Sequence, residues 1–155
     1  MKLKLLLLPL FLATVITSCS SAKSESTSIS SSEEYVIEEE QEIFLEDCLS
    51  QEEEHYIVFF HSDTCKQCQE IKGDVIAFAY ENITKTYFLN IVKPGNQVTI
   101  CPIDDVPTGV DKVEDVAIAG TPTIIEVENG ILTANIPGKD ACLTFLNEQR
   151  KNANL

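Results

Sequence analysis

The stretch AGTPTIIEVENGILTANIPG, residues 119–138, carries the clearest structural signals in the chain. Apolar and β-branched residues dominate 123–127 and 131–136, and this composition predicts two strands. Asn129 and Gly130 lie between them, and an Asn-Gly pair flanked by such runs is a strong signal for a tight hairpin turn. We therefore expect an antiparallel pair of strands in the C-terminal part of the chain.

A last helix is expected directly after this hairpin. Gly138 follows the second strand, and apolar residues then recur among charged and polar ones. Such spacing is typical of an amphipathic helix with one buried face. The candidate buried positions are Ala141, Leu143, Phe145 and Leu146.

Upstream of the hairpin, strands and helices alternate. Residues 56–60 are a continuous apolar run, as in a buried strand, and residues 86–92 predict another strand. Apolar residues at helical spacing predict a helix over 66–81 and an amphipathic helix over 36–50, and a short helix is expected over 111–119. The resulting order, α-β-α-β-α-β-β-α, predicts an α/β domain with a central mixed sheet flanked by helices.

The N-terminus has the features of an export signal. A basic start precedes an apolar run shorter than the ~20 residues of a membrane span, so residues 1–18 are expected to be a cleaved signal peptide. The run ends in Ile16-Thr17-Ser18-Cys19, which resembles the bacterial lipoprotein signal, in which the cysteine is diacylated. This resemblance implies an extracytoplasmic protein that is lipid-anchored to a bacterial membrane through Cys19. The alternative is an ordinary signal peptide followed by an incidental cysteine.

The mature chain is strongly acidic. Residues 19–34 are rich in serine and glutamate and are expected to be a disordered tether ahead of a single folded domain, 35–155. All 25 acidic residues follow residue 18, together with nine of the 11 basic residues, so the mature net charge is near −16. This charge argues against nucleic acid and anionic lipid headgroups as binding partners.

Cys65 and Cys68, in the stretch SDTCKQCQEIK (62–72), are the clearest candidates for chemistry. Their spacing alone allows a redox couple, half of a metal site or a structural bridge. His61 and Asp63 could join the two cysteines as metal ligands. Metal binding nevertheless has little support, because the four ligands of a closed zinc site often come from two separated clusters and the sequence has no second Cys-x-x-Cys or His pair. We therefore expect no metal and no organic cofactor. At the start of a helix, unpaired N–H groups favour a thiolate at the first cysteine.

With these elements, the chain resembles the thioredoxin family over about residues 36–152. The resemblance rests on the Cys-x-x-Cys at a strand-to-helix junction, the Thr121-Pro122 pair, and the strand and Asn-Gly hairpin that follow it. It implies a thioredoxin fold, with Cys65 as the nucleophile and Cys68 as the resolving thiol of a redox-active disulfide. It also implies a cis bond before Pro122 and a substrate strand paired with the backbone of Thr121. A trans proline that begins an edge strand is the alternative.

Several positions depart from the family pattern. Lys66 and Gln67 replace the Gly-Pro of thioredoxin between the two cysteines, so the redox potential does not carry over; Lys66 either favours the thiolate by its charge or points into water. Phe59 stands at the position of the family's buried Asp. His61 replaces a Trp and is a candidate for tuning or proton transfer, or else a packed strand-end residue. Gly73 stands where thioredoxin has a helix-kinking proline, so the family's bend does not carry over to this position.

Residues 93–109 form a longer link than is usual in the family, so we expect an elongated loop before the third helix. The loop carries Cys101. With Cys19 lipidated and the active pair joined, Cys101, Cys48 and Cys142 remain, and an odd number leaves at least one thiol free or paired to another molecule. Cys48 and Cys142 lie in predicted helices and are candidate core residues, whereas Cys101 is a candidate third redox thiol.

The resemblance implies a membrane-anchored, extracytoplasmic thiol–disulfide oxidoreductase that exchanges disulfides with exported proteins or peptides through Cys65 and Cys68. We expect a monomer that exchanges electrons with an unidentified membrane donor or acceptor. The alternative is a non-enzymatic, thioredoxin-like surface lipoprotein that acts as a binding or export-accessory module. Replacement of both cysteines separates the two, because a binding module should tolerate it.

Overall fold

The computed structural model describes residues 37–154, which belong to one compact unit. The expected signal peptide, the lipidation site Cys19 and the tether lie outside these residues. The described part contains a four-stranded sheet in the order β2-β1-β5-β6. Between residues 37 and 154, no helix has the length and apolar character needed to cross a bilayer. The strands are β1 (His55–His61), β2 (Lys85–Asn90), β5 (Thr123–Glu128) and β6 (Ile131–Pro137).

β1 lies inside the sheet, parallel to β2 and antiparallel to β5, and β6 is antiparallel to β5 at the other edge. The predicted mixed sheet is therefore confirmed. Asn129 and Gly130 form the turn between β5 and β6, with φ of 51° and 77°. Left-handed values at both residues match the right-handed twist of the two strands, and the predicted hairpin is confirmed.

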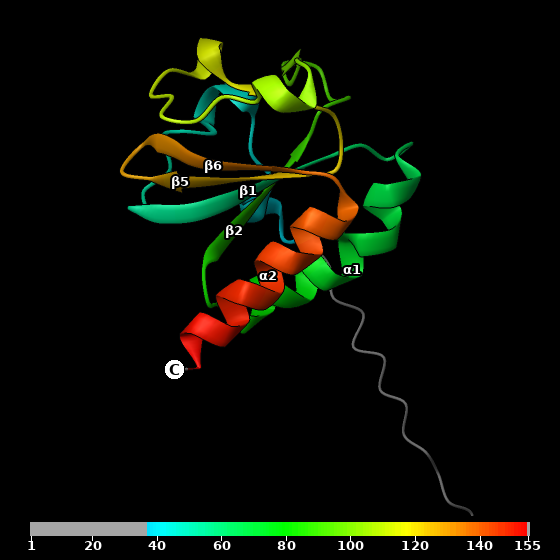
Figure 1. Ribbon diagram of the computed structural model, residues 1–155, viewed down its shortest axis with the longest axis vertical. Helices are drawn as coiled ribbons and strands as arrows, with labels where there is room; N and C mark the ends of the chain where they lie inside the picture. Colours follow the sequence, from blue (N-terminus) through cyan, green and yellow to red (C-terminus); the bar gives the residue numbers. More distant parts are fainter. Residues whose placement is uncertain (1–36, 155) are drawn as a thin grey trace, which may run out of the picture. The chain divides into compact units, whose positions relative to one another are not determined.

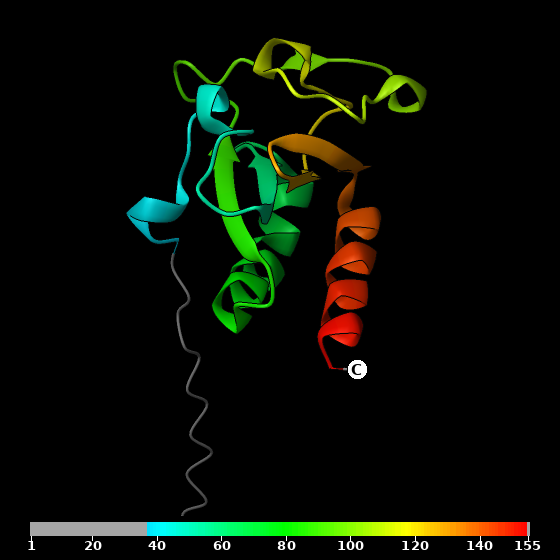
Figure 2. The same cartoon turned by 90° about the vertical axis from the view of Figure 1, so that its left-hand side faces the viewer.

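Two helices, α1 (Lys66–Glu81) and α2 (Lys139–Ala153), lie side by side against one face of the sheet (Figures 1 and 2). Both were predicted, and α1 continues without interruption through Gly73. We call this side of the sheet the helical face. Its buried residues are Ile57, Phe59, Ile71, Val75, Ile76, Phe78, Phe88, Ile124, Cys142 and Leu146.

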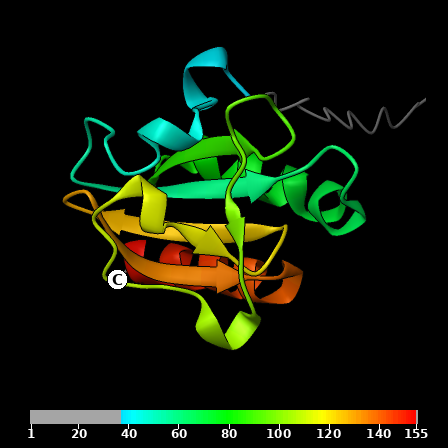
Figure 3. The ribbon, with the colours of Figure 1, turned by 90° about the horizontal axis from the view of Figure 1, so that it is seen from above.

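The opposite side, which we call the loop face, is covered by segments 42–50 and 91–118, seen from above in Figure 3. These segments contain short 3-10 turns and one parallel pair of two-residue strands, β3 (Thr99–Ile100) and β4 (Ala117–Ile118). Successive residues of β1 alternate between the two faces. The buried residues of the loop face are Cys48, Leu49, Tyr56, Val58, Phe60, Tyr87, Leu89, Val116, Ile118, Ile125, Val127 and Leu132.

The predicted amphipathic helix over 36–50 is wrong for the described residues, 37–50. They contain two 3-10 turns, Glu39–Gln41 and Leu45–Asp47, in place of an α-helix. The run is rich in acids and has no basic residue to pair with them, and so short a helix is marginal unless packing supports it. Ile43, Leu45, Cys48 and Leu49 instead pack onto the loop face from an irregular backbone, while Ile37 packs against the core of the helical face.

The predicted helix over 111–119 is also wrong. Val113–Asp115 forms one 3-10 turn, after which the chain enters β4. Val116 and Ile118 are both buried, and this spacing of two residues is the period of a strand. β-branched residues favour that extended form. The link over 93–109 is elongated, as predicted, and carries β3 and one further 3-10 turn.

Candidate active site

Cys65 and Cys68 form a disulfide at the N-terminus of α1. Cys65 caps the helix: its backbone is extended, and its Sγ accepts a hydrogen bond of 3.1 Å from the backbone N–H of Cys68. The unpaired N–H groups and the dipole at a helix N-terminus favour negative charge. After reduction of the disulfide, this position therefore stabilises a thiolate at Cys65.

The two cysteines differ in their access to solvent. Cys65 is partly exposed, whereas only 2% of the surface of Cys68 is exposed. An incoming thiol or disulfide therefore meets Cys65 first. This asymmetry agrees with the roles expected from the sequence, nucleophile and resolving thiol, which remain predictions. Lys66 and Gln67 are both exposed, on the surface that a substrate would approach.

The turn that leads from β1 into α1 is held by its own polar groups. The Oγ of Ser62 lies 3.0 Å from the Oγ1 of Thr64. The carboxylate of Asp63 accepts a hydrogen bond of 2.9 Å from the Nδ2 of Asn90, and its carbonyl accepts one of 2.6 Å from the Nε2 of Gln69. Because Asn90 ends β2, these contacts fix the turn to both the neighbouring strand and the helix.

Thr121 and Pro122 lie beside the disulfide, just before β5. The peptide bond between them is cis, as the family resemblance implied. The carbonyl oxygen of Thr121 lies 3.4 Å from the Sγ of Cys65. The pairing of Thr121 with a substrate strand remains a prediction. A cavity of about 170 Å³ adjoins these residues and is lined by Ile103, Ala119, Gly120, Thr121, Pro122, Pro137 and Gly138.

A second cavity, of about 190 Å³, lies on the other side of the couple. Cys68 is the member of the couple that lines it. The cavity is polar over part of its wall and is large enough to hold water. Its lining residues are Phe59, His61, Ser62, Asp63, Cys68, Gln69 and Lys72.

His61 ends β1 and is buried, with 4% of its surface exposed. Among the described residues, no group forms a hydrogen bond with its buried Nε2. An unpaired buried nitrogen costs roughly 1–3 kcal/mol, so we expect this atom to bind water in the cavity. Burial, followed by the nearby positive charge of Lys72, lowers the pKa of His61, and the ring is therefore neutral near pH 7.

An aromatic ring, Phe59, replaces the buried carboxylate of the thioredoxin family. Phe59 is fully buried, stacks on His61 with ring centroids 5.6 Å apart, and meets Phe88 edge-on at 6.1 Å. Asp63 lines the same cavity as His61 but belongs to an exposed turn. Of the two ionisable groups His61 and Asp63, which both line the cavity beside Cys68, only His61 is therefore buried.

The remaining cysteines of the described part are free thiols in different surroundings. Burial raises the pKa of Cys48 to about 12 and that of Cys142 to about 11. Cys48 belongs to the core of the loop face, in a turn and not in the helix expected there, and Cys142 belongs to the core of the helical face. Cys101 follows β3 and is partly exposed. Its role as a third redox thiol remains a prediction.

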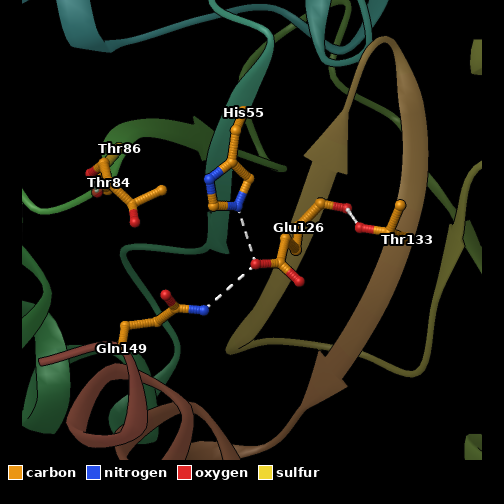
Figure 4. Close-up of polar contacts among 6 residues, drawn as sticks. All are labelled: His55, Thr84, Thr86, Glu126, Thr133 and Gln149. Atoms are coloured by element: carbon orange, nitrogen blue, oxygen red, sulfur yellow. Dashed lines mark hydrogen bonds and ion pairs between the residues drawn. The ribbon is translucent and has the colours of Figure 1, made fainter. Parts of the chain in front are cut away.

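A group of residues with metal-ligand chemistry lies at the end of β1 away from the disulfide. His55, Glu126 and Glu128 place ligand atoms within 4.8 Å of one another, and residues 37–154 contain no other such group. The Nε2 of His55 lies 2.9 Å from the Oε1 of Glu126, to which the Nε2 of Gln149 donates a hydrogen bond of 3.3 Å (Figure 4). These contacts join β1, β5 and α2, so they have a structural purpose.

The cavity beside Cys68 and the position of Lys72 in its wall were not predicted from the sequence. A signal was available, because Lys72 follows Cys68 by four residues and so lies one helical turn further on the same face of α1. The contribution of Ile103 to the cavity beside Thr121 was also missed. It depends on the path of an irregular loop, for which sequence periodicity gives no information.

No protein-family model matches the chain, and no curated protein matches it. Solved structures with a similar fold include thioredoxin f2 from Chlamydomonas reinhardtii, with 14% identity and a TM-score of 0.46 over 69% of this chain and 93% of that one. The long form of spinach chloroplast thioredoxin f is 11% identical, with a TM-score of 0.47 over 71% of this chain and 85% of that one. The reduced periplasmic thioredoxin SoxS from Paracoccus pantotrophus is 17% identical, with a TM-score of 0.34 over 62% of this chain and 95% of that one.

The geometry of the chain itself identifies its fold. A central parallel pair, β1 and β2, is extended by an antiparallel hairpin, β5 and β6. A Cys-x-x-Cys disulfide begins the helix after β1, and a cis-proline lies beside it at the start of β5. With this combination, residues 37–154 have the thioredoxin fold.

Proposed function

We propose that the protein is a membrane-anchored, extracytoplasmic thiol–disulfide oxidoreductase that acts on exported proteins or peptides. One observation carries the enzymatic part of the proposal. The Cys65–Cys68 disulfide caps α1 with its accessible sulfur, 3.4 Å from the carbonyl oxygen of Thr121. A sulfur at this position is exposed to a partner and is stabilised as a thiolate when it is released.

The reaction is two successive thiol–disulfide exchanges. In the reducing direction, the Cys65 thiolate attacks a substrate disulfide, forms a mixed disulfide and expels one substrate thiolate. Cys68 then attacks the sulfur of Cys65, restores the Cys65–Cys68 bond and expels the second substrate thiolate. The substrate gains two electrons and the couple loses two. The oxidising direction is the reverse of these steps, with a dithiol substrate.

The anchored location is supported by the sequence. The Ile16-Thr17-Ser18-Cys19 segment follows a short apolar run, and a diacylated Cys19 would hold the mature chain on a membrane surface. An exported setting permits disulfides to persist. The substrates would therefore be exported proteins or peptides with cysteines, and a membrane-associated partner would return the couple to its starting redox state.

The decisive experiment is a redox titration of the full-length chain in glutathione buffers. Thiols are trapped with a maleimide and counted by mass spectrometry. We expect a reversible two-electron transition with a midpoint between roughly −270 and −120 mV, the range of related oxidoreductases. The midpoint indicates whether the protein donates or accepts disulfides.

Two variants make this titration specific. Cys65→Ser should abolish the two-electron transition, whereas Cys101→Ser, which removes another partly exposed cysteine, should retain it. A disulfide that resists strong reductant, or a transition that survives Cys65→Ser, would overturn the enzymatic proposal. A binding module would be favoured if the Cys65→Ser, Cys68→Ser double variant kept its biological activity.

The anchor is tested separately with Cys19→Ala in the full-length chain. We expect the variant to appear as an unprocessed or released species, because the acyl acceptor is lost. Cell fractionation and the mass of the mature N-terminus provide the measurement. Processing and membrane retention identical to those of the unmodified chain would contradict lipidation and leave the redox proposal intact.

A further inference from the structure

The cavity beside Cys68 contains a feature that the exchange reaction does not by itself explain. His61 lines the cavity, is 96% buried, and has an Nε2 with no hydrogen-bond partner among the described residues. A histidine needed only for packing is usually satisfied by a partner, because a buried polar atom without one is unfavourable. His61 and the resolving cysteine line the same cavity.

Cys68 requires a proton acceptor in this space. The nucleophile of thiol–disulfide exchange is the thiolate, so the Cys68 thiol must lose its proton before or during its attack on the mixed disulfide. Cys68 is almost completely buried, and bulk water does not reach it freely. The family's buried carboxylate is replaced by Phe59, which has no basic group.

We infer that His61 is the proton acceptor for Cys68 and that it acts through water held in the cavity. The inference rests on the proposed redox function and extends it to the resolving step. In that step the proton passes from the Cys68 thiol through water to the Nε2 of His61. Cys68 attacks the Sγ of Cys65, the bond between Cys65 and the substrate sulfur breaks, and the substrate leaves as a thiolate. His61 afterwards returns the proton to solvent or to that thiolate.

The charges around His61 suit this task. Lys72 on α1 and Lys93 after β2 lower the pKa of His61 in addition to the larger effect of burial, while Asp63 and Glu42 act in the opposite direction. The ring is therefore neutral and able to accept a proton at neutral pH. Lys93 is itself paired with Glu42, so Lys72 is the cation with direct access to the cavity wall.

The experiment separates the two exchange steps with dithiobis(nitrobenzoate), a symmetric disulfide that releases a coloured thiolate at each step. The reduced full-length chain, with Cys19→Ser and Cys101→Ser to remove side reactions, is mixed with one equivalent of the reagent. Stopped-flow absorbance then follows a first release at Cys65 and a second release when Cys68 resolves the adduct. His61→Gln retains a polar group that can hold water but accepts no proton near pH 7.

We expect His61→Gln to leave the first release unchanged and to slow the second by at least about tenfold, toward the range of roughly 10²–10⁴ that a positioned proton acceptor contributes. In the parent chain, the second rate should rise with pH through a transition below 6.5 and then level off, as His61 becomes neutral. In the variant, that transition should disappear and the rate should keep rising into the alkaline range. Imidazole should restore the second release in His61→Ala, because the substitution enlarges an existing cavity.

The matched control is His55→Gln, at the other end of the same strand, which should change neither release. A second release in His61→Gln with the parent's rate and pH profile would overturn the inference while the redox proposal stands. So would a slowed release in His61→Ala that imidazole does not restore. If the first release were absent in the parent chain, the redox proposal and this inference would both fall.

Discussion

The two faces of the sheet are buried equally well by different means. The helical face is covered by α1 and α2, whose backbone hydrogen bonds are satisfied within each helix. The loop face is covered by irregular segments, yet its central residues are just as inaccessible, as the neighbours Phe59 and Phe60 show with 0% exposure each. Apolar packing is therefore enough to bury a face of the sheet. Irregular segments, however, need an individual hydrogen-bond partner for each buried backbone group, because they have no regular ladder of such bonds.

Two asparagines, the buried Asn96 and the partly buried Asn135, supply those partners on the loop face. The Oδ1 of Asn96 accepts a hydrogen bond of 2.9 Å from the backbone N–H of Leu45, and its Nδ2 donates one of 3.0 Å to the carbonyl of Asn90. The Nδ2 of Asn135 donates to the carbonyl of Ala117 at 2.9 Å. These side chains link segments that are far apart in the sequence. The irregular cover of the loop face therefore depends on these side chains for its backbone hydrogen bonds, whereas the helices that cover the other face satisfy theirs internally.

The largest effect should come from truncating the two adjacent phenylalanines. Phe59→Ala and Phe60→Ala should each lower the free energy of unfolding by roughly 3–5 kcal/mol, because each leaves a cavity in a packed layer. We expect Phe59→Ala to cost more, since two helices cannot collapse into the space as readily as irregular segments can. Urea denaturation of both variants tests this. An equal or larger loss for Phe60→Ala would show that the loop cover is as rigid as the helices.

A smaller loss is expected for Asn96→Ala. The substitution leaves the Leu45 N–H and the Asn90 carbonyl without their side-chain partner, which should cost roughly 1–3 kcal/mol. The matched variant on the helical face is Arg150→Ala, which breaks an exposed ion pair with Glu81 and should cost about 1 kcal/mol or less. Denaturation midpoints provide the measurement. If Arg150→Ala proved the more damaging, polar contacts would matter more to the helical face than we infer.

The smallest expected difference between the two faces is in the labelling rates of their buried thiols, Cys48 in the loop face and Cys142 in the helical face. Burial holds the pKa of Cys48 at about 12 and that of Cys142 at about 11, so neither is a thiolate in the native state at pH 8. Labelling by N-ethylmaleimide therefore requires local opening. We expect Cys101 to be labelled at once, Cys48 slowly and Cys142 most slowly, because irregular segments open at lower free energy than packed helices. Time-resolved peptide mass spectrometry reads the order directly; simultaneous labelling of Cys48 and Cys142 would mean that both faces open only by global unfolding.

The same contrast explains how far the sequence could predict the structure. The elements of the helical face have regular periodicity. The α1 helix and the β5–β6 hairpin were predicted close to their observed bounds, and α2 was predicted to follow Gly138, as it does. The cover of the loop face has comparable apolar content but no lasting period, so helices were predicted over 36–50 and 111–119 where turns and β4 occur. In such segments, the backbone conformation is set by how each apolar side chain packs on the sheet, and local helix or strand propensity has little influence on it.

The candidate site divides in a similar way. Cys65, Cys68 and Pro122 belong to short motifs, and their proximity follows from the fold that those motifs specify. The cavity beside Cys68 could not be predicted. It is a space left between the side chains of β1, the following turn and α1, and its size depends on their packing in three dimensions. His61 was recognisable as a candidate, but its unpaired nitrogen is visible only in three dimensions.

The covering segments also pair with each edge strand of the sheet at one point. Beside β2, a bridge joins Glu42 to Phe88, and the N–H of Ile43 donates to the Phe88 carbonyl at 3.0 Å. Beside β6, Val110 and Leu132 form the corresponding bridge. An uncovered edge strand is a template for pairing with another chain, and proteins that protect such edges resist aggregation. In a domain crowded with copies of itself on a surface, this partial cover would hinder a foreign strand from extending the sheet along the full length of either edge.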